Sequence, residues 1–207
     1  MVGQGARFDA GNSLAGVFLA QLVIGVLGVL ILSAEYSSGT IRATLAAVPQ
    51  RRTVLVVKAA VFAVVAFVVS LFACLVAFEV AQRIYATHSV EVALSAPGVP
   101  RIILGGALYL TVVGLLGLGL AAILRSTAGA ISTIFGLLLV VPILVQFLPS
   151  DWRADVSPYL PSTAGSGIFR LQAEPGSLAP WTGFALFAGY TVVALVAGAV
   201  VLRRRDA

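Results

Sequence analysis

Few side chains in this sequence have the types and spacing that catalysis requires. Its only histidine, His88, and its only cysteine, Cys74, have no companions that could complete a metal site. Ser166 lies in the tripeptide Gly-Ser-Gly, which superficially resembles a serine-protease signature, but no base accompanies it in an apolar stretch. We therefore expect no enzyme and no metal, with His88 in a solvated loop and Cys74 in packing.

Glu79 and Arg83 form the second candidate, an acid and a base one helical turn apart near the end of a long apolar stretch. A carboxylate inside a membrane could relay protons or contact a substrate. Alternatively, the two side chains form an i, i+4 pair that reaches the membrane surface, and their place at the end of the stretch favours this interpretation. Proton-coupled transport would need a carboxylate nearer the middle of a span, and the sequence has none.

The third candidate is a cation-rich connector, residues 35–53, between two apolar stretches. Gly39 interrupts the preceding stretch, residues 41–48 can form about two turns of helix, and Pro49 ends them. The apolar residues of that helix fall on one face. Such a helix lies on a membrane surface or docks into a groove of a soluble partner. A solvated loop that only anchors topology through its arginines is the equal alternative.

The composition shows which elements position these residues. With 60% hydrophobic and 10% charged residues and a mean hydropathy of +1.07, the chain predicts an integral membrane protein. We expect an all-α polytopic helix bundle in one domain, 1–207, without a cleaved signal peptide. Its five apolar spans are 14–34, 54–80, 101–124, 128–148 and 180–202.

The basic residues predict the orientation of these spans. A cytoplasmic connector places eight cations inside and five outside, and the inner set includes the triple arginine 203–205. The N-terminus is then outside and the C-terminus cytoplasmic. The net charge of +5 could indicate nucleic-acid binding, but the cations lie at span ends, so lipid and not nucleic acid is the expected contact.

The remaining connectors have distinct characters. Residues 81–100 and 149–179 are expected as outer loops, whereas the short turn at 125–127 predicts a tight helical hairpin. Pro142 should kink the fourth span, and Pro180-Trp181 fits a helix start at the interface. Small residues four apart predict close packing of helices within the bundle, with a dimer contact as the alternative. The pairs are Gly117 and Ala121, Ala185 and Gly189, and Ala194 and Gly198.

The connector also carries a family resemblance. Residues 35–42 read Glu-Tyr-Ser-Ser-Gly-Thr-Ile-Arg, and residues 49–52 read Pro-Gln-Arg-Arg. This block resembles the Glu-Tyr-x-x-Gly-Thr-Ile-Arg…Pro-x-x-Arg block of ABC type-2 exporter permeases. Residues 127–131, 159–162 and 203–205 extend the similarity along the chain. Family members usually have six helices, and the family's first helix does not appear in this sequence, so the resemblance implies either that Met1 is an internal start or that the chain is a truncated paralogue.

The resemblance implies a function for the connector. In that family the segment is a short cytoplasmic coupling helix that docks on a separate ATP-hydrolysing subunit. The implied coupling residues are Glu35, Tyr36, Gly39, Thr40, Arg42, Pro49 and Arg51. The chain itself has no phosphate-binding loop, so ATP and Mg²⁺ would be bound by that partner.

The chain is thus expected to be the permease subunit of an ATP-driven exporter in a bacterial cell membrane. A second copy or a paralogue would complete the translocation path, and apolar walls would suit drugs, lipids or amphiphilic peptides. One alternative is a truncated, non-transporting subunit that scaffolds or modulates a full permease. An ion-coupled secondary transporter is disfavoured because mid-span charges and internal repeats are lacking.

Overall fold

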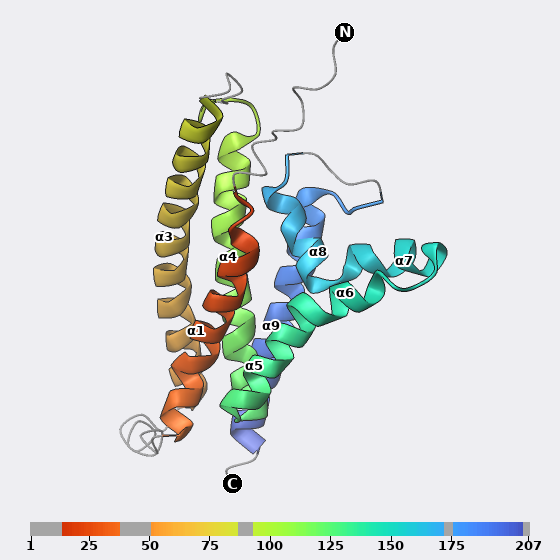
Figure 1. Ribbon diagram of the computed structural model, residues 1–207. Helices are drawn as coiled ribbons and strands as arrows, with labels where there is room; N and C mark the ends of the chain where they lie inside the picture. Colours follow the sequence, from red (N-terminus) through yellow and green to blue (C-terminus); the bar gives the residue numbers. More distant parts are fainter. Residues whose placement is uncertain (1–13, 38–50, 87–92, 172–175, 205–207) are drawn as a thin grey trace.

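The computed structural model describes residues 14–37, 51–86, 93–171 and 176–204, and these residues form helices and short connections (Figure 1). Five helical stretches are long and apolar enough to cross a membrane: Val17–Ala34, Thr53–Ala86, Val99–Leu124, Thr127–Val145 and Pro180–Leu202. The expected all-α polytopic bundle with five spans is therefore confirmed. The expected coupling helix lies outside the described residues.

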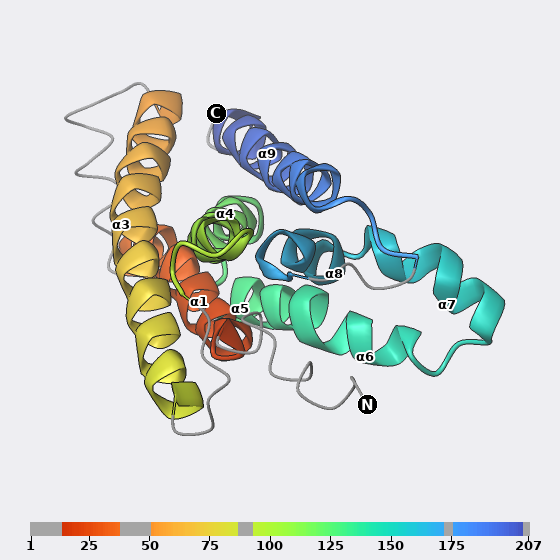
Figure 2. The same ribbon diagram turned by 90° about the horizontal axis from the view of Figure 1, so that it is seen from above.

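Helix α4 (Val99–Leu124) is the central element of the bundle. Helices α1 (Val17–Ser37), α3 (Arg51–Ala86) and α9 (Pro180–Arg204) surround it, as the view from above shows (Figure 2). Of the α4 span, 67% is buried inside the protein, against 22% to 39% of the other four spans. The outer helices therefore turn much of their apolar surface outward, as expected for helices that face lipid.

Glycines allow the backbones of α1 and α4 to touch. A Cβ atom added to Gly28 would lie 1.9 Å from the carbonyl oxygen of Gly114, and one added to Gly117 would lie 2.3 Å from that of Gly25. These four glycines are called the α1–α4 glycine seam below. In a membrane, where helices gain little from the hydrophobic effect, such close approach supplies van der Waals contact.

The small residues of α9 divide into two groups. A Cβ atom on Gly198 would lie 2.6 Å from the Cβ of Ala122, and one on Gly119 would lie 3.0 Å from the carbonyl carbon of Ala194. Gly117 and Gly198 therefore make the internal contacts that their spacing predicted. Ala185 and Gly189 are exposed, and no atom lies within 4 Å of a Cβ placed on Gly189.

The fourth span contains a wide helical turn. Helix α5 (Thr127–Phe135) continues through π-helical residues Gly136–Val140 into α6 (Val141–Val145). The backbone N–H of Val141 donates to the carbonyl of Gly136, five residues back. Because Pro142 has no N–H and its ring crowds the carbonyl four residues earlier, a wide turn directly before it relieves that conflict. The predicted irregularity at Pro142 is therefore a π-helical turn.

The hairpin between the third and fourth spans is as short as the sequence predicts. Helix α4 ends at Leu124, and Arg125 takes a left-handed conformation with φ of 52°. The backbone N–H of Arg125 donates to the carbonyl of Ala121 at 3.0 Å. Ser126 then caps α5, accepting a hydrogen bond from the backbone N–H of Gly129 at 3.2 Å.

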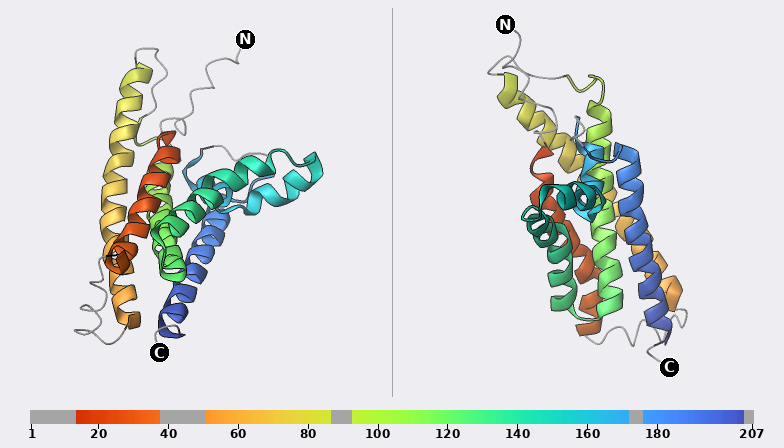
Figure 3. Two further views of the ribbon diagram at one scale, coloured as in Figure 1. Left: turned by 60° about the horizontal axis from the view of Figure 1, so that its bottom comes forward. Right: turned by 90° about the vertical axis from the view of Figure 1, so that its right-hand side faces the viewer.

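Residues 149–179 differ from the expected outer loop, because much of the segment is helical. It contains α7 (Ser150–Val156), a 3₁₀ turn Ser157–Tyr159, α8 (Pro161–Ser166) and a second 3₁₀ turn Gly167–Phe169. Pro149, Pro158 and Pro161 stand at the starts of these helical turns, where a missing N–H costs nothing. The segment leaves the bundle sideways and returns, and α8 packs against α9 (Figure 3).

Candidate functional site

The coupling segment is represented by its two flanks. Glu35 and Tyr36 lie in the last turn of α1, and Arg51 lies in the first turn of α3. The other expected coupling residues lie outside the described residues: Gly39, Thr40, Arg42 and Pro49. The two flanks reach the same end of the bundle, at the bottom of Figure 1, together with the α4–α5 turn and the end of α9. We call this the lower end.

Charge is distributed unequally between the two ends. Among the described residues, the lower end carries one acid, Glu35, and six cations: Arg51, Arg52, Lys58, Arg125, Arg203 and Arg204. The upper end carries one acid, Glu79, and three cations, Arg83, Arg101 and Arg170, while α7, which projects from the side of the bundle, carries Asp151, Arg153 and Asp155 (Figure 1). A net positive lower end is the pattern that the positive-inside rule associates with the cytoplasmic side.

A buried polar contact joins α1 to α4 inside the bundle. The hydroxyl of Tyr109 donates a hydrogen bond to the side-chain oxygen of Gln21, and both residues are buried. The Tyr109 ring also packs against Phe169 and Phe187, with ring centroids 5.2 and 5.4 Å away. Tyr109 of α4 thus contacts α1, α9 and the segment that runs from α7 to the 3₁₀ turn Gly167–Phe169. This segment is called the returning segment below. Neither Gln21 nor Tyr109 is among the candidates predicted from the sequence, although both are polar residues within apolar stretches.

The returning segment is held at its upper end by Arg101. Its Nη2 atom donates to the carbonyl of Arg170 at 3.0 Å and to that of Leu171 at 3.5 Å. These carbonyls directly follow the 3₁₀ turn Gly167–Phe169, at the end of a helical turn where carbonyls commonly need partners from outside the helix. Close packing completes the attachment, since a Cβ on Gly105 would lie 2.7 Å from the carbonyl oxygen of Ile168. Arg101 therefore fixes the segment to the start of α4.

Glu79 and Arg83 lie one turn apart on α3, and both side chains are exposed. No ion pair between these two side chains is present in the described residues of α3. Helix α3 is 36 residues long, or about 54 Å at 1.5 Å per residue, whereas a bilayer core is about 30 Å thick. Counted from Thr53, Glu79 lies about 39 Å along the helix. The interface interpretation of Glu79 and Arg83 stays a prediction.

Cys74 is buried between α3 and α4, where its Sγ atom faces Gly106. Within the described ranges, no three His, Cys, Asp or Glu side chains gather as a metal site would require. His88 lies outside those ranges. Ser166 is buried in α8, and its hydroxyl donates to the carbonyl of Thr163 at 3.1 Å. That hydrogen bond is local helix structure rather than the activation of a nucleophile.

Comparisons of the chain with protein-family models, with curated proteins and with solved structures found no match. The functional assignment therefore depends on the connector sequence and on the geometry of the bundle.

Proposed function

We propose that this chain is the membrane-spanning permease subunit of an ATP-driven exporter of the ABC type-2 class, located in a bacterial cell membrane. The observation that carries the proposal is the block at residues 35–42 and 49–52, which resembles the coupling segment of that class. In this proposal the lower end is cytoplasmic, and a second copy or a paralogue completes the path.

The geometry around the connector supports such a role. A segment that touches a soluble partner must leave and re-enter the bundle at one end, and α1 ends and α3 begins at the same end of the bundle (Figure 1). That end carries the excess of positive charge among the described residues. The chain has no phosphate-binding loop, so the energy of ATP would have to come from a partner.

The proposed mechanism uses the helices next to the connector. ATP binding would bring two ATPase subunits together, and each connector would move with its ATPase. Helix α1 would carry this movement into the bundle, since the glycine seam and the Tyr109–Gln21 hydrogen bond attach it to α4. The binding free energy of ATP would then shift the permease between inward-open and outward-open states.

The test is co-purification from native membranes in a mild detergent, followed by mass spectrometry for subunits with ATP-binding cassettes. We expect such a subunit to accompany the wild-type chain and to be lost with Arg42→Glu. Arg83→Glu is the matched control, because it reverses the same charge at the opposite end of the bundle and should retain the ATPase. If neither the wild type nor the control recovers an ATPase, the proposal is wrong.

Loss of binding must be separated from loss of folding. The Arg42→Glu chain should therefore elute as the wild type does in size-exclusion chromatography and unfold at the same temperature. In reconstituted vesicles containing the ATPase, the same variant should lower ATP-dependent transport at least roughly ten-fold, equivalent to about 1.4 kcal/mol of coupling free energy. Normal transport by a folded Arg42→Glu chain would exclude the coupling role of the segment.

A further inference from the structure

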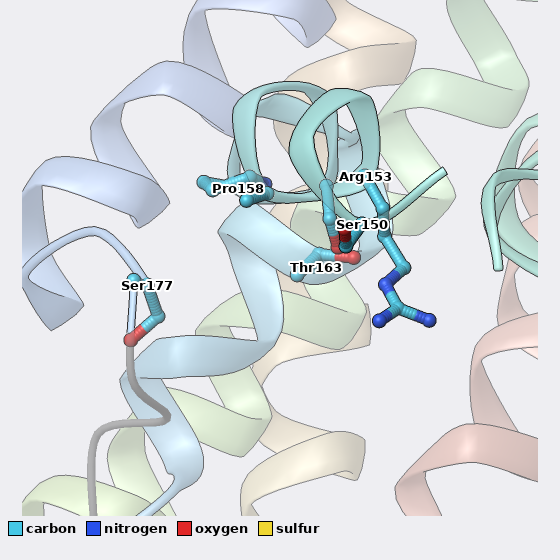
Figure 4. A pocket seen from close by; sticks show the side chains of 8 residues that line it. Ser150, Arg153, Pro158, Thr163 and Ser177 are labelled. Atoms are coloured by element: carbon cyan, nitrogen blue, oxygen red, sulfur yellow. The ribbon is translucent and has the colours of Figure 1, made fainter. Parts of the chain in front are cut away.

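A small pocket opens at the side of the bundle, where α7 and the following 3₁₀ turn face α8 and residues 176–177 (Figure 1). Its volume is about 280 Å³. Ser150, Arg153, Ser157, Thr163 and Ser177 supply its polar lining. Figure 4 shows Thr163 near the centre, with Arg153 and Ser177 on opposite sides. Drug-sized ligands occupy about 300–1,000 Å³, so this pocket suits a smaller group.

The spacing of residues along α7 determines which of its side chains face the pocket. Ser150 and Ser157 are three residues before and four residues after Arg153, so all three lie on one face. Asp155 is two residues after Arg153 and therefore lies on the opposite side of the helix. The pocket thus receives a cation and hydroxyl groups, and the one carboxylate next to it, Asp151, accepts a hydrogen bond from the Ser150 hydroxyl.

Several donors of the pocket have no partner in the part of the chain that the structure describes. Among the described residues, the Arg153 guanidinium and the hydroxyls of Ser157, Thr163 and Ser177 make no hydrogen bond or ion pair. Only the Ser150 hydroxyl is engaged, donating to its neighbour Asp151 at 3.2 Å. A guanidinium presents a planar set of N–H donors that matches the oxygens of phosphate, and hydroxyls add further donors. An anion with several oxygens would satisfy this lining.

Tryptophans indicate the depth of the pocket in the membrane. The chain has two, and both are exposed: Trp152 on α7 at 68% and Trp181 at the start of α9 at 59%. Tyr159, in the 3₁₀ turn that follows α7, is 56% exposed. Tryptophan and tyrosine concentrate at the level of lipid headgroups, where their rings meet lipid and their polar atoms meet water. The pocket therefore opens at headgroup level.

We propose that this pocket binds the phosphate of an anionic phospholipid headgroup, with Arg153 as the charged contact and Ser157 and Thr163 as hydroxyl donors. Occupancy would attach the α7–α8 segment to the lipid leaflet. The site is independent of the proposed transport function, because none of its residues belongs to the connector.

The probe is a short-chain phosphatidylglycerol, titrated by native mass spectrometry into the full chain purified in an uncharged detergent. A diacylglycerol with the same acyl chains tests for binding without phosphate, and inorganic phosphate tests for a soluble anion. We expect Arg153→Gln to weaken phosphatidylglycerol binding at least roughly ten-fold, as for the loss of a charge-assisted hydrogen bond. Arg83→Gln removes an exposed arginine outside the pocket and should leave the affinity unchanged.

The outcomes separate the alternatives. Equal weakening by Arg153→Gln and Arg83→Gln would show general charge attraction and overturn the site. Diacylglycerol binding as tight as that of phosphatidylglycerol would overturn the role of the phosphate. If inorganic phosphate displaces the lipid at a similar concentration, the pocket is an anion site, but the lipid is not its specific ligand and the proposal is overturned. If Arg153→Gln fails to fold, Thr163→Val keeps the side-chain shape and should still weaken binding a few-fold, whereas an unchanged affinity would contradict the proposal.

Discussion

Replacing Gly28 with alanine tests the α1–α4 glycine seam directly. The added Cβ would lie 1.9 Å from the carbonyl oxygen of Gly114 and 2.7 Å from its carbonyl carbon. Both are backbone atoms of a neighbouring helix, so no side-chain rotation can relieve the contact. The two helices would have to move apart by about 1 Å to restore a normal distance, and a gap of that size forfeits a quarter to a half of each van der Waals contact that it separates.

The expected loss of stability follows from two opposing effects. Overpacking of a tight interior site costs about 1–3 kcal/mol. Alanine is the better helix former by about 0.8–1.0 kcal/mol, which offsets part of this cost. Because the clash involves backbone on both sides, we place the overpacking cost at its upper limit and expect a net destabilisation of about 2 kcal/mol.

The assay is unfolding of the purified chain in mixed micelles by increasing sodium dodecyl sulfate, followed by circular dichroism. Gly189→Ala is the matched control, since this exposed glycine of α9 has no atom within 4 Å of an added Cβ. The control should be as stable as the wild type or slightly more stable. Equal stability of Gly28→Ala and Gly189→Ala would refute the conclusion that α1 and α4 pack backbone to backbone.

Two further substitutions test the polar contacts of the bundle. Tyr109→Phe leaves the buried Gln21 without its hydrogen-bond donor and should cost about 1 kcal/mol in the same assay, whereas Tyr190→Phe, which loses an exposed hydrogen bond, should cost less than about 0.5 kcal/mol. Arg101→Gln removes the donors to the carbonyls of Arg170 and Leu171, so hydrogen–deuterium exchange at residues 167–171 should become faster, and unchanged exchange would show that Arg101 does not hold this segment.

Hydropathy located all five spans, but it did not determine where each helix ends. Helix α3 continues to Ala86, six residues beyond the expected boundary, because Ala-Gln-Arg-Ile-Tyr-Ala at 81–86 contains no helix breaker. Residues 149–179 were expected as a loop from their prolines and glycines. Pro149, Pro158 and Pro161 stand at helix starts instead, and Gly165 lets α8 approach Tyr109 and Phe187. A residue that breaks one helix and begins another gives no local signal to distinguish the two roles.

The candidate sites differ in how far sequence could identify them. The connector stands out in the sequence because it is a charged segment between apolar stretches. Its two flanks lie at the same end of the bundle. The pocket at α7 could not be found in the sequence, because it combines α7 with residues from other segments, such as Thr163 and Ser177. Arg153 was counted among the five cations expected outside, but nothing in the sequence singles it out. Arg153 faces away from Asp155 because the two residues are two positions apart on a helix. This could not be inferred from the sequence, because the segment was expected to be a loop.

Helix α1 offers a physical route between the two ends of the bundle. Its last turn enters the connector, its middle is attached to α4 by glycines that leave no room for sliding, and Gln21 near its start bonds Tyr109. Tyr109 in turn contacts Phe169 of the returning segment. Because packed helices shift as rigid units rather than deform continuously, a tilt of α1 at the lower end should be accompanied by movement of α4 and of the returning segment. Under the proposed function, a double-mutant cycle of Gly28→Ala and Arg42→Glu should therefore show non-additive loss of transport, whereas additive losses would mean that the connector acts through α3 instead.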